Sequence, residues 1–336
     1  MFHLSSMQTG LSEEEQAIGG ELSPTEVYDV EGGLRRLLRS LKTRIQGELR
    51  ENLRFAVSLA ALAAFGGFAC ALCEEGKLRS LLEICICSTA AMILTGSMDS
   101  LIRQTNEAIY RLSDYSKAAL PVVFTAAAAS GAASAASRYA AVSFALDVLM
   151  SLSQRMILPL IHAYLALTLS AALFPNAMLK AVTKLLRWAA GILMTGTSLA
   201  FTAYLGMTGA ISTAVNSAAV KATKTLISTA LPVVGGMISD ASAMVLSAAG
   251  IVRSCAGAFG LISVCAICLG PFVLLTVRML LFKAVAVLAE AVPCGRLPAL
   301  LGGLSDAAAL LMGMLGSCAL MLFLSFTLAM KAVTAG

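Results

Sequence analysis

Long apolar runs separated by short charged segments dominate the chain from Phe55 onward, whereas charge is concentrated before that residue. A helix needs about 20 mainly apolar residues to cross the hydrocarbon core of a membrane. A run at 139–174 is interrupted by Asp147 and Arg155, and it predicts either two short spans or one span beside a re-entrant segment. The pattern predicts an all-α polytopic membrane protein with about seven or eight transmembrane helices and amphipathic helices at the interface. The other apolar runs lie at 55–73, 81–98, 118–136, 189–207, 256–277 and 307–329.

The first 54 residues follow a different pattern. Residues 1–22 are polar and predict a flexible N-terminus or a short acidic helix. Ser23 then supplies a helix N-cap, with Pro24 at the first helical position and Glu26 three residues after the cap. Over residues 23–54, leucines at helical spacing and basic residues on the other face predict an amphipathic helix. Such a helix lies in the membrane interface or docks on the bundle, and the multi-span domain follows from 55 to 336.

Composition excludes several classes of protein. Hydrophobic residues make up 58% of the chain and aromatic residues only 6%, which is not typical of an outer-membrane barrel with aromatic girdles. The formal net charge is +5, and much of it comes from the basic run at 35–54. A basic surface without interleaved aromatic residues suits anionic phospholipid headgroups better than nucleic acid. Membrane lipid is therefore an expected partner, and nucleic acid is not.

The sequence offers little for catalysis. It contains no G-x-S-x-G, H-E-x-x-H or phosphate-cradling G-x-x-x-x-G-K-[ST] motif, which disfavours an enzyme. Two C-x-x-C pairs, Cys70/Cys73 and Cys265/Cys268, lie inside apolar runs. Because reactive or ligating thiolates need polar, accessible surroundings, these pairs predict buried apolar thiols. We predict no catalytic residue, cofactor or metal.

Ionisable residues within or beside the apolar runs are the candidate site residues, because charge in hydrocarbon is costly and usually faces the interior of a bundle. Asp147 and Arg155 are close enough in sequence to pair across a turn, and Asp240 has three basic residues as candidate partners. Each group fits an ion pair that fixes helix packing, or a hydrated path or docking surface for partner subunits. The charged candidates are Asp147, Arg155, Lys221, Lys224, Asp240, Arg253, Arg278, Lys283 and Glu290.

Residues 208–254 are the least typical of a lipid-facing segment. A proline break at Leu231-Pro232 precedes Gly235 and Gly236, which would allow tight helix approach or a re-entrant hairpin. Helices this polar lie at the interface or line a protein-enclosed, hydrated place. The polar stripe before the break consists of Thr213, Ser217, Lys221, Lys224 and Ser228.

The C-terminal half carries a resemblance to a known family. Its most distinctive piece is Leu231-Pro-Val-Val-Gly-Gly-Met-Ile-Ser-Asp240. The supporting segments are Lys180–Trp188, 189–207, 222–241, the span that ends at Arg278, the amphipathic segment at Lys283 and the last apolar helix before Lys331. Over residues 55–336 the chain resembles the stage III sporulation protein AE family.

The resemblance implies a multi-pass subunit of the mother-cell membrane that surrounds the forespore. The implied partners are ring-forming subunits, a cytoplasmic ATPase and small membrane subunits, which are thought to build a channel or secretion-like conduit required for forespore development. The chain would act there as a scaffold and a candidate lining of the conduit. A stand-alone small-solute or ion transporter is the alternative, and intramembrane Asp147, Asp240 and Glu83, with the basic residues, would serve it. The sequence leaves the copy number open.

The orientation of the N-terminus is also open. Members of the family usually begin with a cleaved signal peptide, whereas this chain carries Glu13, Glu14 and Glu15 among its first 20 residues. The resemblance therefore predicts a signal upstream of Met1 and places the next segment outside the cytoplasm. The basic run at 35–54 favours a cytoplasmic N-terminus by the positive-inside rule.

Overall fold

The computed structural model describes residues 11–19, 29–72, 77–129, 135–174, 176–230, 235–290 and 296–331, and over 208–230 and 235–254 it describes the backbone alone. This part of the chain is helical almost throughout and contains no strand. Six helices within it are long and apolar enough to cross a membrane. The all-α polytopic class predicted from the apolar runs is therefore confirmed.

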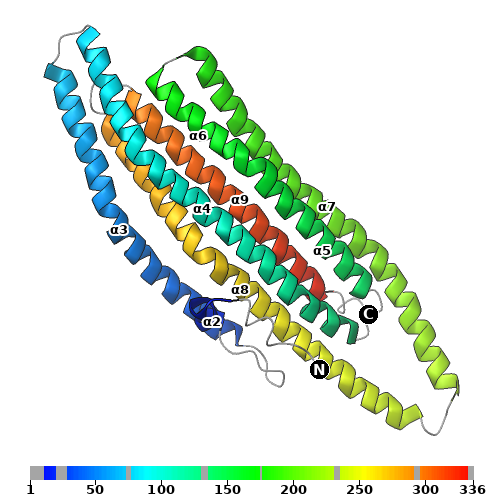
Figure 1. The fold of residues 1–336 in the computed structure, drawn as a ribbon. Helices are drawn as coiled ribbons and strands as arrows, with labels where there is room; N and C mark the ends of the chain where they lie inside the picture. The colour runs from blue at the N-terminus through cyan, green and yellow to red at the C-terminus, as the bar shows by residue number, and fades with distance from the viewer. Residues whose placement is uncertain are drawn as a thin grey trace.

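The long helices lie side by side in an elongated bundle (Figure 1). The C-terminal ends of α3, α6 and α8 and the N-terminal ends of α4, α7 and α9 lie at one end of the bundle, which we call the hairpin end. The elements are α2 (Glu13–Gly19), α3 (Val30–Leu72), α4 (Lys77–Ala129), α5 (Ala135–Leu152), the π-helical turn η1 (Ser153–Ile157), α6 (Leu158–Leu173), α7 (Ala177–Ala230), α8 (Gly235–Glu290) and α9 (Arg296–Lys331).

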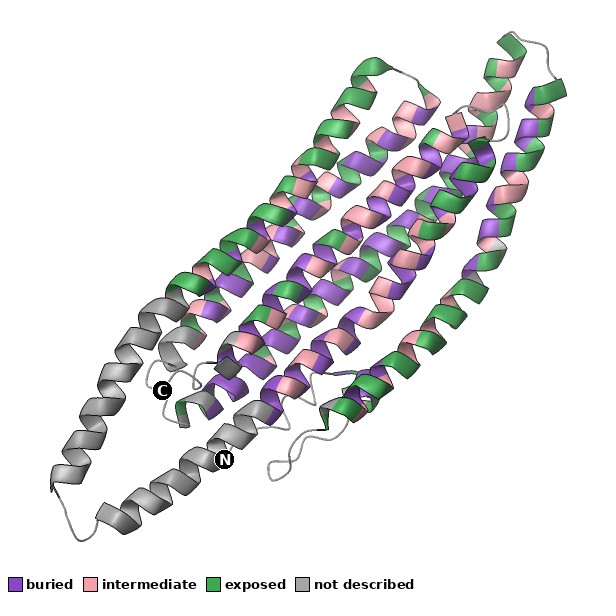
Figure 2. Cartoon of the chain, turned by 180° about the vertical axis from the view of Figure 1, so that it is seen from behind, coloured by how far each residue is buried: buried purple, intermediate pink, exposed green. Residues whose placement is uncertain are grey.

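The pair α8 and α9 forms the centre of the bundle. Helices α3 and α4 pack on α8, whereas α4, α6 and α7 pack on α9. Helix α9 buries leucines at helical spacing almost completely, as expected for a helix with neighbours on several sides. Among them are Leu297, Leu300, Leu304, Leu311 and Leu315. Figure 2 shows buried residues concentrated in the central helices and exposed residues along the outer sides of α3 and α7.

Helix α3 joins the predicted amphipathic helix and the predicted first span in one element. Leu37 in its first half and Leu59 in its second half are both buried, and α3 packs along α8. The first half therefore docks on the bundle, which is one of the two arrangements that the sequence left open. Contact between its outer face and a membrane interface stays a prediction, and the predicted N-cap at Ser23 lies outside the described residues.

Helix α4 combines three segments that the sequence pattern predicted as separate. The apolar runs at 81–98 and 118–129 and the mixed-charge segment between them form one continuous helix. At 1.5 Å per residue, α4 is about 80 Å long, whereas the hydrocarbon core is about 30 Å thick. Two predicted spans therefore share one helix, and the run at 139–174 forms one candidate span rather than two, which accounts for the difference between the predicted count and six.

The interrupted run at 139–174 is one nearly continuous rod with a defect. Helices α5 and α6 are joined through η1, which includes Arg155. Pro159 follows four residues after Arg155, and a proline has no N–H and crowds the carbonyl four residues earlier. A wider π-helical turn at this point relieves that crowding, which is one of the usual causes of a helix irregularity.

Two glycines let α9 and its neighbours approach closely. A Cβ atom on Gly303 would lie 2.3 Å from Thr168 Cγ2 of α6, and one on Gly260 of α8 would lie 2.5 Å from the Phe326 ring of α9. The Tyr164 hydroxyl of α6 donates to the Gly303 carbonyl at 3.2 Å. These contacts fix the depth of α6 and α8 relative to α9.

The short helix α2 corresponds to the acidic helix that the sequence allowed before the basic segment. Leu11 and Ile18 are buried, and α2 packs against α8. Arg111 of α4 donates to the buried Glu15 carboxylate at 2.5 Å, and Arg36 of α3 donates to the Ile18 carbonyl at 3.0 Å. One basic residue from each of two long helices thus holds α2 in place.

Candidate functional site

A cluster of polar contacts joins α4, α6 and α9 at the hairpin end. Arg296 Nε lies 3.3 Å from Glu83 Oε2, and the two side chains are only 20% and 17% exposed. Arg296 also donates to the Leu173 carbonyl at 3.0 Å and to Ser80 Oγ at 3.3 Å. Arg79 Nε approaches Glu83 Oε1 at 3.9 Å. The sequence pointed to Glu83 as an intramembrane acid near the start of an apolar run, but it did not point to its partner Arg296.

A second set of contacts lies deeper in the bundle, around Arg278 of α8. Arg278 Nη1 donates to Ser97 Oγ of α4 at 2.8 Å. The guanidinium lies 4.6 Å from the centre of the Phe55 ring of α3, within the range of a cation–π interaction. The Phe55 ring in turn packs edge-on against Phe282 at 6.4 Å. Arg278 therefore connects α3, α4 and α8 at one depth, that is, at one position along the bundle axis.

At the same position along the bundle axis, further contacts connect α8 to α9 and α9 to α7. Ser305 Oγ of α9 donates to the carbonyl of Met279, the residue after Arg278. The next residue of α9, Asp306, pairs with Arg187 of α7. We call this depth the crossover level, and it is marked by Phe55, Ser97, Arg278, Ser305, Asp306 and Arg187.

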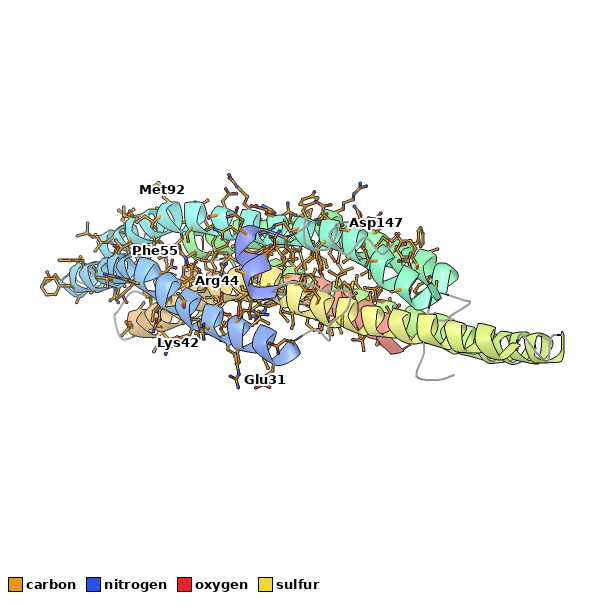
Figure 3. All side chains as sticks on the ribbon, turned by 90° about the horizontal axis from the view of Figure 1, so that it is seen from below. Glu31, Lys42, Arg44, Phe55, Met92 and Asp147 are labelled. Atoms are coloured by element: carbon orange, nitrogen blue, oxygen red, sulfur yellow. The ribbon has the colours of Figure 1, made fainter. Side chains whose placement is uncertain are left out.

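The outer faces of α3 and α4 change character at the crossover level. On the hairpin side of it, α3 exposes Phe65 and Phe68 and α4 exposes Met92 and Ile93. Figure 3 shows Met92, and on the far side of the level Lys42 and Glu31, projecting from the bundle. Beyond the level the outer face of α4 becomes polar, and we call it the α4 charged face. Its exposed polar and charged residues are Asp99, Ser100, Arg103, Gln104, Glu107, Asp114 and Lys117, and Tyr110 is exposed among them.

The outer face of α7 changes at the same depth in the opposite sense. On the hairpin side it is mixed and exposes the charged Lys180 and Lys184 beside Met178 and Leu185. Beyond the level it becomes apolar, with exposed Trp188, Leu199 and Met207. A shallow groove of about 700 Å³ runs along this face. It is lined by Lys184, Arg187, Trp188, Gly191, Ile192, Thr195, Gly196 and Leu199.

The chain was compared with known protein families, and one family matches most of its length. The family described as stage III sporulation protein AE matches residues 28–333. The chain belongs to this family. The match confirms the resemblance and begins earlier than the 55–336 predicted from the sequence, so it includes nearly all of α3. No curated protein and no solved structure matched the chain.

The stage III sporulation protein AE fold separates two residues that we expected to pair. Asp147 Oδ1 lies 3.7 Å from Lys117 Nζ of α4, with both side chains largely exposed. Arg155 is exposed in η1. The predicted pair between Asp147 and Arg155 across a turn was wrong, because the chain between them is helical and no turn brings them back together.

The C-terminal charges of this family member are not gathered either. Arg278 is partly buried against α3 and α4, whereas Lys283 and Glu290 are exposed on the same helix. Arg278 thus has the packing role expected for a lone charge in an apolar run. The candidates that lie outside the described side chains, and so stay predictions, are Lys221, Lys224, Gly235, Gly236, Asp240 and Arg253.

The cysteines of the stage III sporulation protein AE chain agree with the interpretation as apolar thiols where they are described. Cys70 and Cys268 are buried and Cys265 is partly buried. The described cysteines form no disulfide, and Cys73 lies outside the described residues. Among the described side chains, no three His, Cys, Asp or Glu residues are grouped to hold a metal ion.

Proposed function

We propose that this protein is an integral membrane subunit of the complex between mother cell and forespore, where it acts as a scaffold and a candidate lining of a channel or secretion-like conduit. The observation that carries the proposal is the family match over residues 28–333. The six helices of spanning length and composition within the described residues support it. The proposed location is the mother-cell membrane around the forespore, and the proposed role is structural rather than catalytic.

The length of the helices supports a role in an assembly. A bilayer with its headgroups is about 40–45 Å thick, whereas α4 is about 80 Å long at 1.5 Å per residue. Part of the bundle must therefore lie outside the lipid, where the α4 charged face offers side chains of both signs. Such a surface suits electrostatic recognition by other proteins. The proposed partners are ring-forming subunits, a cytoplasmic ATPase and small membrane subunits of the same complex.

Co-purification from sporulating cells tests the proposal. We expect the tagged chain to restore forespore development in a strain that lacks it and to retain the other stage III subunits. Reversing two charges on the α4 charged face, Glu107→Lys with Asp114→Lys, should lower partner recovery by about tenfold because complementary charges are lost. The matched control is Glu31→Lys, an exposed reversal near the start of α3, which should retain the partners.

Two results would contradict the proposed function. A chain that is recovered alone from sporulating cells, and that carries ion or solute flux by itself in liposomes, would contradict the scaffold role and favour a stand-alone transporter. Normal forespore development in the strain that lacks the chain would contradict any role in sporulation.

A further inference from the structure

Helices α4 and α7 can be compared at one depth because contacts connect them through the centre of the bundle. Ser97 of α4 bonds Arg278, whose neighbour Met279 accepts from Ser305. Asp306 then pairs with Arg187 of α7. A second contact between α4 and α9 lies further from the hairpin end, where the rings of Tyr115 and Phe326 pack with their centres 6.3 Å apart. Both α4 and α7 run away from the hairpin end, so their outer faces can be read in the same direction.

The apolar outer faces of the two helices meet the crossover level from opposite sides. The apolar face of α4, from Leu78 to Gly96, lies on the hairpin side and ends at the level. The apolar face of α7, from Trp188 to Met207, begins at the level and extends away from the hairpin end. Each segment is about 28–30 Å long at 1.5 Å per residue, which is the thickness of the hydrocarbon core for a helix along the bilayer normal. The two apolar faces are thus offset by nearly a full membrane thickness.

A bilayer perpendicular to the bundle axis cannot satisfy both faces. If the membrane surrounded the apolar face of α7, the charged residues from Asp99 to Lys117 on α4 would lie at the depth of hydrocarbon. If it surrounded the apolar face of α4, Leu199 and Met207 would lie in water, and Lys180 and Lys184 would lie at the depth of hydrocarbon. Both arrangements place charge where it is most costly.

We propose that the lipid-facing belt of this protein runs diagonally, from the hairpin-end faces of α3 and α4 to the far face of α7, so that the bundle axis is strongly tilted in the bilayer. Helix α9 separates α4 from α7, and two packing distances plus the outer side chains span about 30 Å. The centres of the two faces are about 29 Å apart along the bundle axis, which over this width gives a tilt of about 44°, slightly above the range for membrane helices.

The tilted plane removes the conflict between charge and lipid. It places the α4 charged face on one side of the membrane and Lys180 and Lys184 of α7 on the other. Lys283 is exposed about 8 Å from Arg278 along α8 on the hairpin side, and its long aliphatic stem lets the ammonium group extend toward the interface. The arrangement concerns only how the chain sits in lipid, so it holds whichever partners the protein has.

Single cysteines placed at four exposed positions of the full-length chain test the tilt. Met92→Cys and Leu199→Cys lie in the two halves of the proposed belt, whereas Gln104→Cys and Lys180→Cys lie outside it on opposite sides. Right-side-out and inverted vesicles are treated with a membrane-impermeant maleimide, and the unsubstituted chain gives the background from the native thiols. We expect the thiols introduced at positions 92 and 199 to react roughly tenfold or more slowly than the other two, since the thiolate is the reactive form. Detergent should abolish the difference.

The side of labelling completes the test. We expect position 104 to label in one vesicle orientation and position 180 in the other. Rapid labelling at either 92 or 199 would overturn the diagonal belt in favour of a level membrane at one end of the bundle. Labelling of 104 in both orientations would replace it with an aqueous path along α4, and labelling of 104 and 180 from the same side, or protection of either, would also overturn it. Loss of partner binding would leave every one of these results unchanged.

Discussion

Replacing Arg296 by methionine is expected to lower the free energy of unfolding by about 3 kcal/mol, because it leaves a largely buried carboxylate without its main partner. Arg296 contacts Glu83 at 3.3 Å and also donates to the Leu173 carbonyl and to Ser80. The change therefore breaks the connection between α4, α6 and α9 at the hairpin end. The midpoint of thermal unfolding of the purified protein in lipid nanodiscs measures the loss.

The matched control for Arg296→Met is the same substitution at Arg103. Its pair with Asp99 is 2.9 Å long, but the side chains are 79% and 60% exposed, and an exposed pair contributes at most about 1 kcal/mol. Neutralising the partner as well, in Glu83→Gln with Arg296→Met, should recover part of the stability. Equal losses at Arg296 and Arg103 would show that burial does not strengthen the hairpin-end cluster.

The second large effect is expected for Gly303→Ala, which should destabilise the protein by about 1–3 kcal/mol through overpacking. The new methyl group would lie 2.3 Å from Thr168 Cγ2. Thr168 is buried and β-branched, and its hydroxyl donates to the Tyr164 carbonyl at 2.8 Å, so the side chain cannot turn away cheaply. Helices α6 and α9 must separate instead, which the unfolding midpoint reports.

The neighbouring glycine supplies the control. A Cβ atom on Gly302 meets no heavy atom within 4 Å, so Gly302→Ala should leave stability unchanged or raise it by up to about 1 kcal/mol through helix propensity. Thr168→Ser removes the clashing methyl group and keeps a hydroxyl, and it should rescue Gly303→Ala. A rescue failure, or the same loss from both glycine substitutions, would show that the clash is not the cause.

Local patterns predicted the helices well because each apolar run is a property of consecutive residues. They could not predict that α4 continues through its charged segment. Arg103 and Asp99 form an i,i+4 pair on the surface of a helix, and this pattern is the same in an isolated interfacial helix and in a continuous rod. The extent of α3 was hidden for the same reason, since a docked and a membrane-bound amphipathic helix share one periodicity.

Consecutive residues predicted some residues of the site but not their partners. Arg278 was a candidate because a lone charge in an apolar run stands out, and the structure gives it partners on α3 and α4. Arg296 drew no attention because it lies in a short connection, and its partner Glu83 is distant in sequence. The opposite change in the outer faces of α4 and α7 depends on which residues share a depth, and only packing determines that.

The continuity of α3 has a mechanical consequence. Its charged half lies beyond the crossover level, its apolar half lies toward the hairpin end, and no proline separates them. A helix without such a break has no sharp kink at which its two halves could move independently. Any neighbouring molecule that displaces the charged half would therefore also displace the apolar half, and the two halves meet where the Phe55 ring contacts Arg278.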